Sequence, residues 1–237
     1  MHRPSVSLVI PMYNEELNIE HAVAAAVESL QKYSDDYEII IVDDASTDDS
    51  PQLAAKLARE NPRIRVITHA RNQKLGATLR SGFAATTKEL IFYMDADIPF
   101  DPEVLGNAIR AMHVTGADMI AAYRHDRTME GARRAVYTLI YNWLIGVLFG
   151  WPDRDINFSF KLMKRKVLEA IELKSEGSLI DAELVVKAKN RGFAIQQMGI
   201  DYFPRIRGTS NLASVGVILK IIRELVKLYP EMRAKHR

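Results

Sequence analysis

The chain has 237 residues, of which 48% are hydrophobic and 26% charged, and its formal net charge is +2. This composition is typical of a globular protein with a full core and excludes an intrinsically disordered chain. The small net charge gives no reason to expect nucleic acid as a partner. Because there is no cysteine, disulfides and thiolate metal sites are excluded, and a reducing compartment is expected.

Strand and helix patterns alternate over the first 125 residues. Short runs rich in β-branched residues are each followed by a stretch with helical spacing of its apolar residues, which favours βαβ units and a mainly parallel sheet. The predicted strands are 6–10, 39–42, 65–68, 90–94 and 119–122, and the predicted helices are 15–33, 53–61, 77–86 and 102–113. Such a sheet binds ligands beyond the carboxyl ends of its strands.

The second part of the chain is less regular. Residues 135–152 carry no charge, and their number is at the lower limit for a bilayer span. A buried core helix, a helix lying in the membrane interface and a true span remain open alternatives. Four aromatic residues favour the interfacial helix, namely Tyr137, Tyr141, Trp143 and Trp151.

Four further elements complete the predicted order. Residues 156–164 and 194–198 have strand patterns, and residues 181–191 form a helix between them. A last helix, 215–229, is strongly amphipathic. It packs on the domain, lies on a membrane or pairs with a partner.

Two acids at the end of a buried strand are the most informative feature. Asp95 and Asp97 follow the apolar run 91–94, and two carboxylates at a strand end can hold a hard divalent cation on a diphosphate. The alternative is a surface turn with two solvated aspartates. A second apolar strand ends in Asp43 and Asp44, which suggests one nucleotide-binding edge.

Polar residues after the first strands extend this edge. Tyr13 can stack on a base and Glu15 can accept a hydrogen bond from a ribose, although a plain helix cap by Asn14 is the simpler alternative. Asp43 or Asp44 can accept the ring N–H of uracil or guanine. Lys74, with Arg71, can offset the charge of a diphosphate.

A cationic group comes later in the chain. Arginine forks suit phosphate oxygens, and five arginines are candidates to receive an acceptor phosphate: Arg124, Arg133, Arg134, Arg205 and Arg207. Each of them can instead be a solvated surface side chain. Asp155 is expected to orient them.

Four motifs together resemble the GT-A glycosyltransferases of family 2. They are residues 9–16, residues 42–48, Arg71-Asn72 with Gly76 and Gly82, and Asp95-Ala96-Asp97 with 101–103. The resemblance covers roughly residues 5–212. Within the family it is to the polyprenyl-phosphate sugar synthases of the dolichol-phosphate mannosyltransferase type, which Asp155, Asp181 and residues 207–210 fit more loosely.

The resemblance implies a Rossmann-like GT-A fold with a mainly parallel mixed sheet flanked by helices. It implies an inverting hexose transfer from a donor of the GDP-mannose or UDP-glucose type to a polyprenyl (dolichyl or undecaprenyl) phosphate. Mg²⁺ or Mn²⁺ would be held by Asp95 and Asp97, which with Arg124 form the expected catalytic set. The expected donor contacts are Pro11, Tyr13, Asn14, Glu15, Asp43, Asp44, Lys74, Gly76 and Ala96.

Three departures from the family pattern concern the cation and the acceptor. Pro99 stands where many relatives have a glutamine that assists the metal, Lys74 replaces a glycine, and residues 155–161 lack the usual Thr-Ser-Gly. A saccharide, glycolipid or protein acceptor therefore remains an alternative, and it would need a general base such as Asp155 or Asp181. A sugar-nucleotide-binding module without turnover is an alternative of another class.

The expected organisation is one catalytic domain, 1–212, followed by an amphipathic helix and tail, 213–237. Residues 1–125 would bind the nucleotide sugar and residues 126–212 the acceptor. The expected partners are the donor, the lipid acceptor, a membrane surface and, as an open alternative, a separate membrane subunit. The expected location is the cytoplasm, peripherally on the inner face of a membrane.

Overall fold

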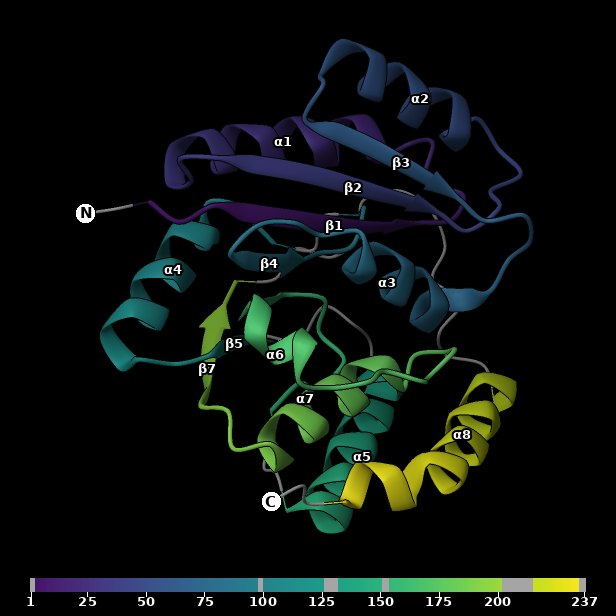
Figure 1. The fold of residues 1–237 in the computed structure, drawn as a ribbon. Coiled ribbons are helices and arrows are strands. Elements are labelled where there is room, and N and C mark those ends of the chain that lie inside the picture. The colour runs from purple at the N-terminus through teal and green to yellow at the C-terminus, as the bar shows by residue number, and fades with distance from the viewer. Residues whose placement is uncertain (1–2, 98–99, 126–131, 151–153, 202–214, 235–237) are drawn as a thin grey trace.

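The computed structural model describes residues 3–97, 100–125, 132–150, 154–201 and 215–234, with the backbone alone for 132–137 and 215–220. One sheet organises these residues (Figure 1), and its strands lie in the order β3-β2-β1-β4-β6-β5-β7. In chain order the strands are β1 (Val6–Met12), β2 (Tyr37–Asp43), β3 (Ile64–Thr68), β4 (Leu90–Tyr93), β5 (Met119–Arg124), β6 (Lys161–Lys164) and β7 (Ile195–Ile200).

The sheet is mixed and mainly parallel, as the alternating pattern predicts. Strands β1, β2, β3 and β4 pair in parallel, and so do β5 and β7. Only β6 runs the other way, between β4 and β5. The carboxyl ends of β1, β2, β4 and β5 therefore meet at one edge of the sheet.

Helices cover both faces of the sheet. Apolar residues of α1, α2 and α4 join one core cluster, and those of α3, α5, α6, α7 and α8 join the other. The helices are α1 (Ile19–Tyr33), α2 (Ser50–Glu60), α3 (Lys74–Ala84), α4 (Val104–Thr115), α5 (Ala132–Phe149), α6 (Arg165–Glu169), α7 (Ile180–Asn190) and α8 (Val215–Arg233).

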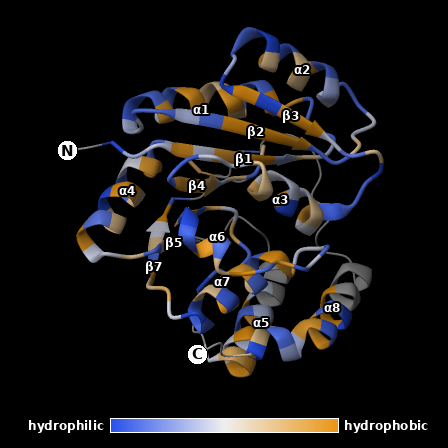
Figure 2. Ribbon diagram, in the orientation of Figure 1, coloured by the Kyte–Doolittle hydropathy of each residue, from blue (hydrophilic) through white to orange (hydrophobic). Residues whose placement is uncertain are grey.

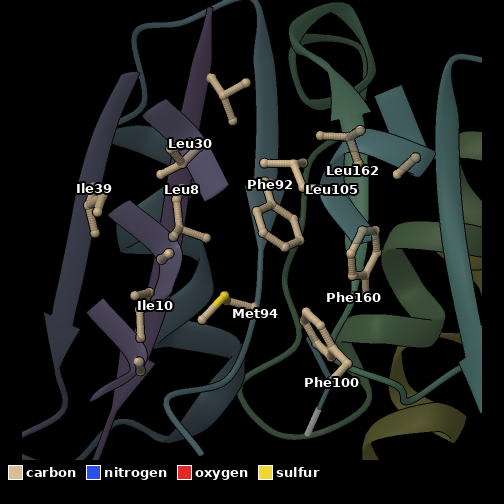
Figure 3. Packing of buried hydrophobic residues seen from close by; sticks show 14 of the residues in the cluster. Leu8, Ile10, Leu30, Ile39, Phe92, Met94, Phe100, Leu105, Phe160 and Leu162 are labelled. Carbon is tan, nitrogen blue, oxygen red and sulfur yellow. The ribbon is translucent and has the colours of Figure 1, made fainter. Parts of the chain in front are cut away.

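Alternation along the strands divides the core between the two faces. Leu8 and Ile10 point into the first cluster, and Val9 between them belongs to the second. The central strands are apolar along most of their length (Figure 2). In the first cluster the Phe160 ring lies against Phe92 and Phe100, with ring centroids 4.8 and 5.1 Å apart (Figure 3). These rings fix the start of β6 beside β4.

Most predicted strands differ from the structure by one or two residues at an end, and two of the differences have a clear physical reason. The strand predicted at 156–164 is wrong for its first part, because only Lys161–Lys164 pairs with its neighbours. The Lys161 ammonium binds the carbonyls of Ile156 and Phe158, which holds that stretch out of the sheet. In contrast, β1 continues past Pro11, since β1 pairs with β4 only as far as Val9 and Pro11 lies opposite Val42 of β2.

Predicted helix starts also differ: α2 begins at Ser50 instead of residue 53 and α4 at Val104 instead of residue 102. Two further differences lie at the candidate site. The first helix begins at Ile19 instead of residue 15, because Glu15 to Asn18 form a turn closed by the Asn18 amide and the Glu15 carboxylate. Helix α3 begins at Lys74 instead of residue 77 and includes Gly76. A Cβ atom on Gly76 would lie 2.2 Å from the Ser175 carbonyl oxygen, so glycine permits this close approach.

Each amphipathic helix of the second half has a buried and an exposed face. Ile145 of α5 is buried, whereas Leu139 and Trp143 are 68% and 66% exposed. Leu225 and Leu228 of α8 pack in the second core cluster. Among the described residues, no helix has both the length and the apolar character needed to cross a membrane.

Candidate active site

The predicted site residues gather at the carboxyl edge of the sheet. Tyr13 follows β1, Asp44 follows β2, Asp95 follows β4, and Arg124 ends β5. Parallel strands bring these ends together, as the sequence suggests. The edge is acidic at β2 and β4 and cationic at β5.

The loops after β1 and β2 are tied to each other. Asn14 has a left-handed backbone, with φ of 56°, and its side-chain oxygen accepts the Thr47 N–H at 2.8 Å. The Asn14 N–H in turn donates to the Ser46 hydroxyl at 3.0 Å. Asn14 is therefore no cap of α1, and the capping alternative is wrong. The pair of loops leaves Tyr13 45% exposed at the edge, where a planar base can stack.

The two aspartates after β2 have different surroundings. Both oxygens of Asp44 are engaged, since the carboxylate accepts the N–H groups of Gln73 and Lys74 at 2.8 and 2.7 Å and lies 2.7 Å from His69 Nδ1. Asp43 Oδ1 accepts the Ser46 N–H, but its buried Oδ2 has no hydrogen-bond partner among the described residues. The free acceptor of this pair is thus on Asp43.

Asp44 also fixes the start of α3. Lys74 is exposed and left-handed, with φ of 71°, and its N–H is held by Asp44. Two residues on, the Gly76 N–H donates to the Glu176 carbonyl at 2.8 Å. The first turn of α3 is therefore held between the β2 edge and the loop before α7.

Asp95 and Asp97 form the acidic centre of the site. Burial raises the pKa of Asp95 to about 8, with further contributions from the Asp97 and Asp181 carboxylates. A hydrogen bond from Ser159 acts in the opposite direction. Ala96 between the two acids is buried. The site concentrates negative charge where little water is available to solvate it.

These acids suit a hard divalent cation. Carboxylate oxygens are the ligands that Mg²⁺ and Mn²⁺ prefer, and a cation would offset the repulsion from Asp97 and Asp181 that contributes to the raised pKa of Asp95. No group of three or more His, Cys, Asp or Glu side chains able to hold a metal occurs within the described residues. The two acids thus fit a cation that completes its coordination with diphosphate oxygens and water.

Arg124 lies across the edge from the acids and is buried. Its Nε and Nη2 atoms donate to the two oxygens of Asp155, at 2.5 and 2.8 Å. The guanidinium carbon also lies 5.3 Å from the centre of the Phe158 ring. Asp155 and the ring together fix the plane of the guanidinium.

The side chains of the other four predicted arginines are not described by the structure. Arg133 and Arg134 lie in the first turn of α5, where only the backbone is described, and Arg205 and Arg207 lie outside the described residues. Arg154, which the sequence does not single out, stacks on Tyr123 with its guanidinium carbon 4.9 Å from the ring centre.

Three residues at the site are not singled out by the sequence analysis. His69 bridges Asp44 and the Ser81 hydroxyl, Ser159 contacts Asp95, and Lys161 lies 2.8 Å from Asp181. Only Lys161 gives a signal in the sequence, as a lysine between the apolar residues Phe160 and Leu162. The other two are ordinary polar residues until the fold brings them to the edge.

Comparison with known sequences identifies the family. The model of glycosyl transferase family 2 matches residues 7–172, more than half of the chain. The Haloferax volcanii protein named glycosyltransferase AglD is 27% identical over 98% of this chain. Dodecaprenyl-phosphate galacturonate synthase of Rhizobium johnstonii is 26% identical over 98%, and dolichol-phosphate mannosyltransferase of Pyrococcus furiosus is 27% identical over 94%. The chain spans 38%, 68% and 63% of the lengths of these relatives.

Solved structures support the fold. Glucosyl-3-phosphoglycerate synthase of Mycobacterium tuberculosis, in complex with Mn²⁺, uridine diphosphate and glucosyl-3-phosphoglycerate, matches with a TM-score of 0.73 at 20% identity. The match covers 94% of this chain and 79% of the other. The same enzyme in complex with phosphoglyceric acid matches with a TM-score of 0.71. The fold is therefore GT-A, and with the match over residues 7–172 the chain belongs to glycosyl transferase family 2, a family of transferases.

Proposed function

We propose that this chain transfers a hexose, with inversion, from a nucleotide sugar to a polyprenyl phosphate. The observation that carries the proposal is the half-buried pair of Asp95 and Asp97 at the carboxyl edge of the sheet, with the Arg124–Asp155 pair across from it. An acidic centre for a cation and a diphosphate beside an arginine suits a reaction between two phosphate-bearing substrates. Two relatives are named as enzymes of polyprenyl or dolichol phosphate.

The donor is proposed to bind across β1, β2 and β4. Its base would stack on Tyr13 and donate a ring N–H to Asp43 Oδ2, which is buried without a partner among the described residues. Pro11, Asn14 and Glu15 would line the ribose side, and Asp44 would act through the start of α3, where Lys74 and Gly76 face the diphosphate. Asp95, Ala96 and Asp97 would meet the diphosphate through Mg²⁺ or Mn²⁺.

The proposed chemistry needs little from the protein beyond positioning and charge. An oxygen of the acceptor phosphate attacks the anomeric carbon, and the bond from that carbon to the donor diphosphate breaks. A phosphate monoester is already ionised at neutral pH, so no general base is required. Arg124 would hold the acceptor phosphate in line with the breaking bond. The cation, when bound, supplies charge stabilisation for the leaving diphosphate.

The lipid acceptor is proposed to approach along α5. The outer face of this helix exposes Leu139, Ile140, Trp143 and Val147. An open, mainly apolar groove of about 590 Å³ lies there, and Arg154 is among its lining residues. An apolar helix face rich in large side chains suits a lipid surface. We therefore propose peripheral membrane association, with residues 1–125 as the donor half and 126–212 as the acceptor half.

A panel of donors and acceptors with the purified protein tests the proposal. GDP-mannose, UDP-glucose and related donors are combined with Mn²⁺ or Mg²⁺ and with a short polyprenyl phosphate or soluble sugars. The expected result is a polyprenyl phosphohexose with inverted configuration. Turnover of a soluble hydroxyl acceptor, with polyprenyl phosphate inert, would contradict the lipid acceptor. Tight donor binding without transfer or hydrolysis would indicate a binding module.

A further inference from the structure

A lysine is fully enclosed behind the acidic centre. Lys161 is the first residue of β6, and its side chain is 1% exposed. Its ammonium donates to the Ile156 carbonyl at 3.0 Å and to the Phe158 carbonyl at 2.6 Å. It lies 2.8 Å from Asp181 Oδ1, and that carboxylate is 2% exposed. The ammonium thus donates two hydrogen bonds to backbone carbonyls and forms an ion pair with the Asp181 carboxylate.

The two carbonyls belong to the segment that crosses the edge of the sheet. Residues 155–160 lead into β6, and β6 lies between β4 and β5. One end of the segment carries Asp155, which binds Arg124. The other end carries Ser159, which bonds to Asp95. The segment therefore touches both the cationic and the acidic side of the site.

The two phenylalanines of the segment pack in the core, on the other face of the sheet from Lys161. The rings of Phe158 and Phe160 enter the first core cluster, and their centroids lie 5.7 and 5.1 Å from that of Phe100. The Lys161 side chain lies on the other face of the sheet, since its ammonium is 5.9 Å from the centre of the Tyr93 ring, which belongs to the second cluster. The phenylalanines anchor the segment from one side, while the Lys161 ammonium holds its carbonyls from the other.

We propose that Lys161 and Asp181 form a buried positioning pair. Asp181 fixes the Lys161 ammonium, and the ammonium holds residues 155–160 in place. Within that segment, Asp155 sets the orientation of Arg124 and Ser159 sets the orientation of Asp95. Neither residue of the pair touches substrate. Asp181 is thus a counter-ion and not a general base, since its buried carboxylate faces Lys161. The roles of Arg124 and Asp95 in transfer rest on the proposed function, but their placement by this pair does not.

Asp181 variants distinguish a positioning residue from a base. Asp181→Asn keeps a side-chain oxygen opposite the Lys161 ammonium but loses the charge, so kcat of the folded variant with polyprenyl phosphate is expected to fall by less than about tenfold. Asp181→Leu offers no acceptor, and its kcat is expected to fall by about 100-fold, as for a misplaced catalytic group. A loss of about 100-fold or more in folded Asp181→Asn would indicate a general base and overturn the proposal.

Lys161→Met tests the other partner, with Lys164→Met as the matched control. Lys164 lies at the far end of β6, and its ammonium pairs with the Asp118 carboxylate at 3.1 Å, away from the edge. The NMR signal of the Arg124 Nε–H reports the Arg124–Asp155 pair directly. It is expected to shift or broaden in Lys161→Met and to stay unchanged in Lys164→Met.

The double variant Lys161→Met/Asp181→Leu distinguishes loss of positioning from loss of the folded state. It leaves no unpaired buried charge, so its melting temperature is expected to recover relative to Lys161→Met alone, while the Arg124 signal stays perturbed. A wild-type Arg124 signal in either Lys161 variant would overturn the proposal. This signal needs no acceptor, so a failed transfer assay would count against the proposed function and not against the pair.

Discussion

Arg124 and Asp155 form a buried ion pair in which both oxygens of the carboxylate are engaged by one guanidinium. Arg124 ends a strand of the sheet, and Asp155 opens the segment that leads into β6. The Arg124 guanidinium is bound by Asp155 on one side and lies near the Phe158 ring. Its orientation is therefore fixed. A fixed guanidinium is well suited to orient a phosphate.

Breaking this pair is expected to cost both stability and activity. Asp155→Asn removes the charge opposite the buried Arg124, which typically destabilises a protein by about 3–5 kcal/mol. Chemical denaturation measures this loss, and kcat with the acceptor is expected to fall with it. The double variant Arg124→Met/Asp155→Leu should regain stability but not activity. Full activity in the double variant would show that Arg124 is not needed for transfer.

The raised pKa of Asp95 predicts a pH-dependent stability. The pKa lies near 8 in the folded protein, against an ordinary value of 3.8, so the folded state keeps a proton that the unfolded state has released. Without a divalent cation, this group therefore lowers stability as pH rises from about 4 to about 8. Asp95→Asn removes this contribution.

Melting temperatures in the presence of a chelator check this prediction. The Asp95→Asn variant should gain stability relative to the wild type as pH rises from 5 to 8. Added Mn²⁺ should stabilise the wild type most at pH 8, because at that pH the Asp95 carboxyl has already lost more of its proton and the cation has less to displace. It should have little effect on the variant. Parallel curves for the two proteins would contradict a raised pKa of Asp95.

The two aspartates after β2 are expected to give opposite phenotypes. Asp43→Asn places an amide N–H where Oδ2 would accept the base, so donor affinity should fall by about tenfold or more, because a buried donor is left unpaired. Asp44→Ala instead removes the acceptor for the Gln73 and Lys74 N–H groups at the start of α3 and the partner of His69. It should lower the free energy of unfolding by about 1–3 kcal/mol.

Calorimetric titration with the donor and denaturant unfolding separate these effects. The expected result is weak donor binding with near-normal stability for Asp43→Asn and reduced stability for Asp44→Ala. Unchanged donor affinity in Asp43→Asn would place the base elsewhere.

The sequence predicts the edge of the sheet well because its signals are local. Apolar runs that end in Asp43 or Asp95 predict both a strand and the polar residues at its end. Contacts between distant residues have no such signal. Nothing near Gly76 predicts that the Ser175 carbonyl approaches it, so the predicted start of α3 is wrong. Likewise, side chains at 158–164 do alternate between the two core clusters, but the tertiary contacts of Lys161 decide where β6 begins to pair with its neighbouring strands.

The exposed face of α5 is expected to bind lipid. Leu139→Ser/Trp143→Ser should weaken binding to vesicles of anionic phospholipid by at least about tenfold, since burying one large apolar side chain contributes about 1.5–3 kcal/mol. Val114→Ser is the matched control, because Val114 is 80% exposed on α4, against the opposite face of the sheet. Co-sedimentation with vesicles measures the difference. Equal binding of both variants would exclude this face as the lipid contact.

The most direct test of a cation site at Asp95 and Asp97 is donor binding to Asp97→Ala with and without Mn²⁺. Calorimetry with GDP-mannose and UDP-glucose compares this variant with the wild type and with Asp101→Asn, an exposed aspartate nearby. The Mn²⁺-dependent part of the donor affinity is expected to fall by about 100-fold in Asp97→Ala, which loses one of two protein ligands, and to be kept in Asp101→Asn. Undiminished Mn²⁺-dependent binding by Asp97→Ala would contradict the proposed cation site.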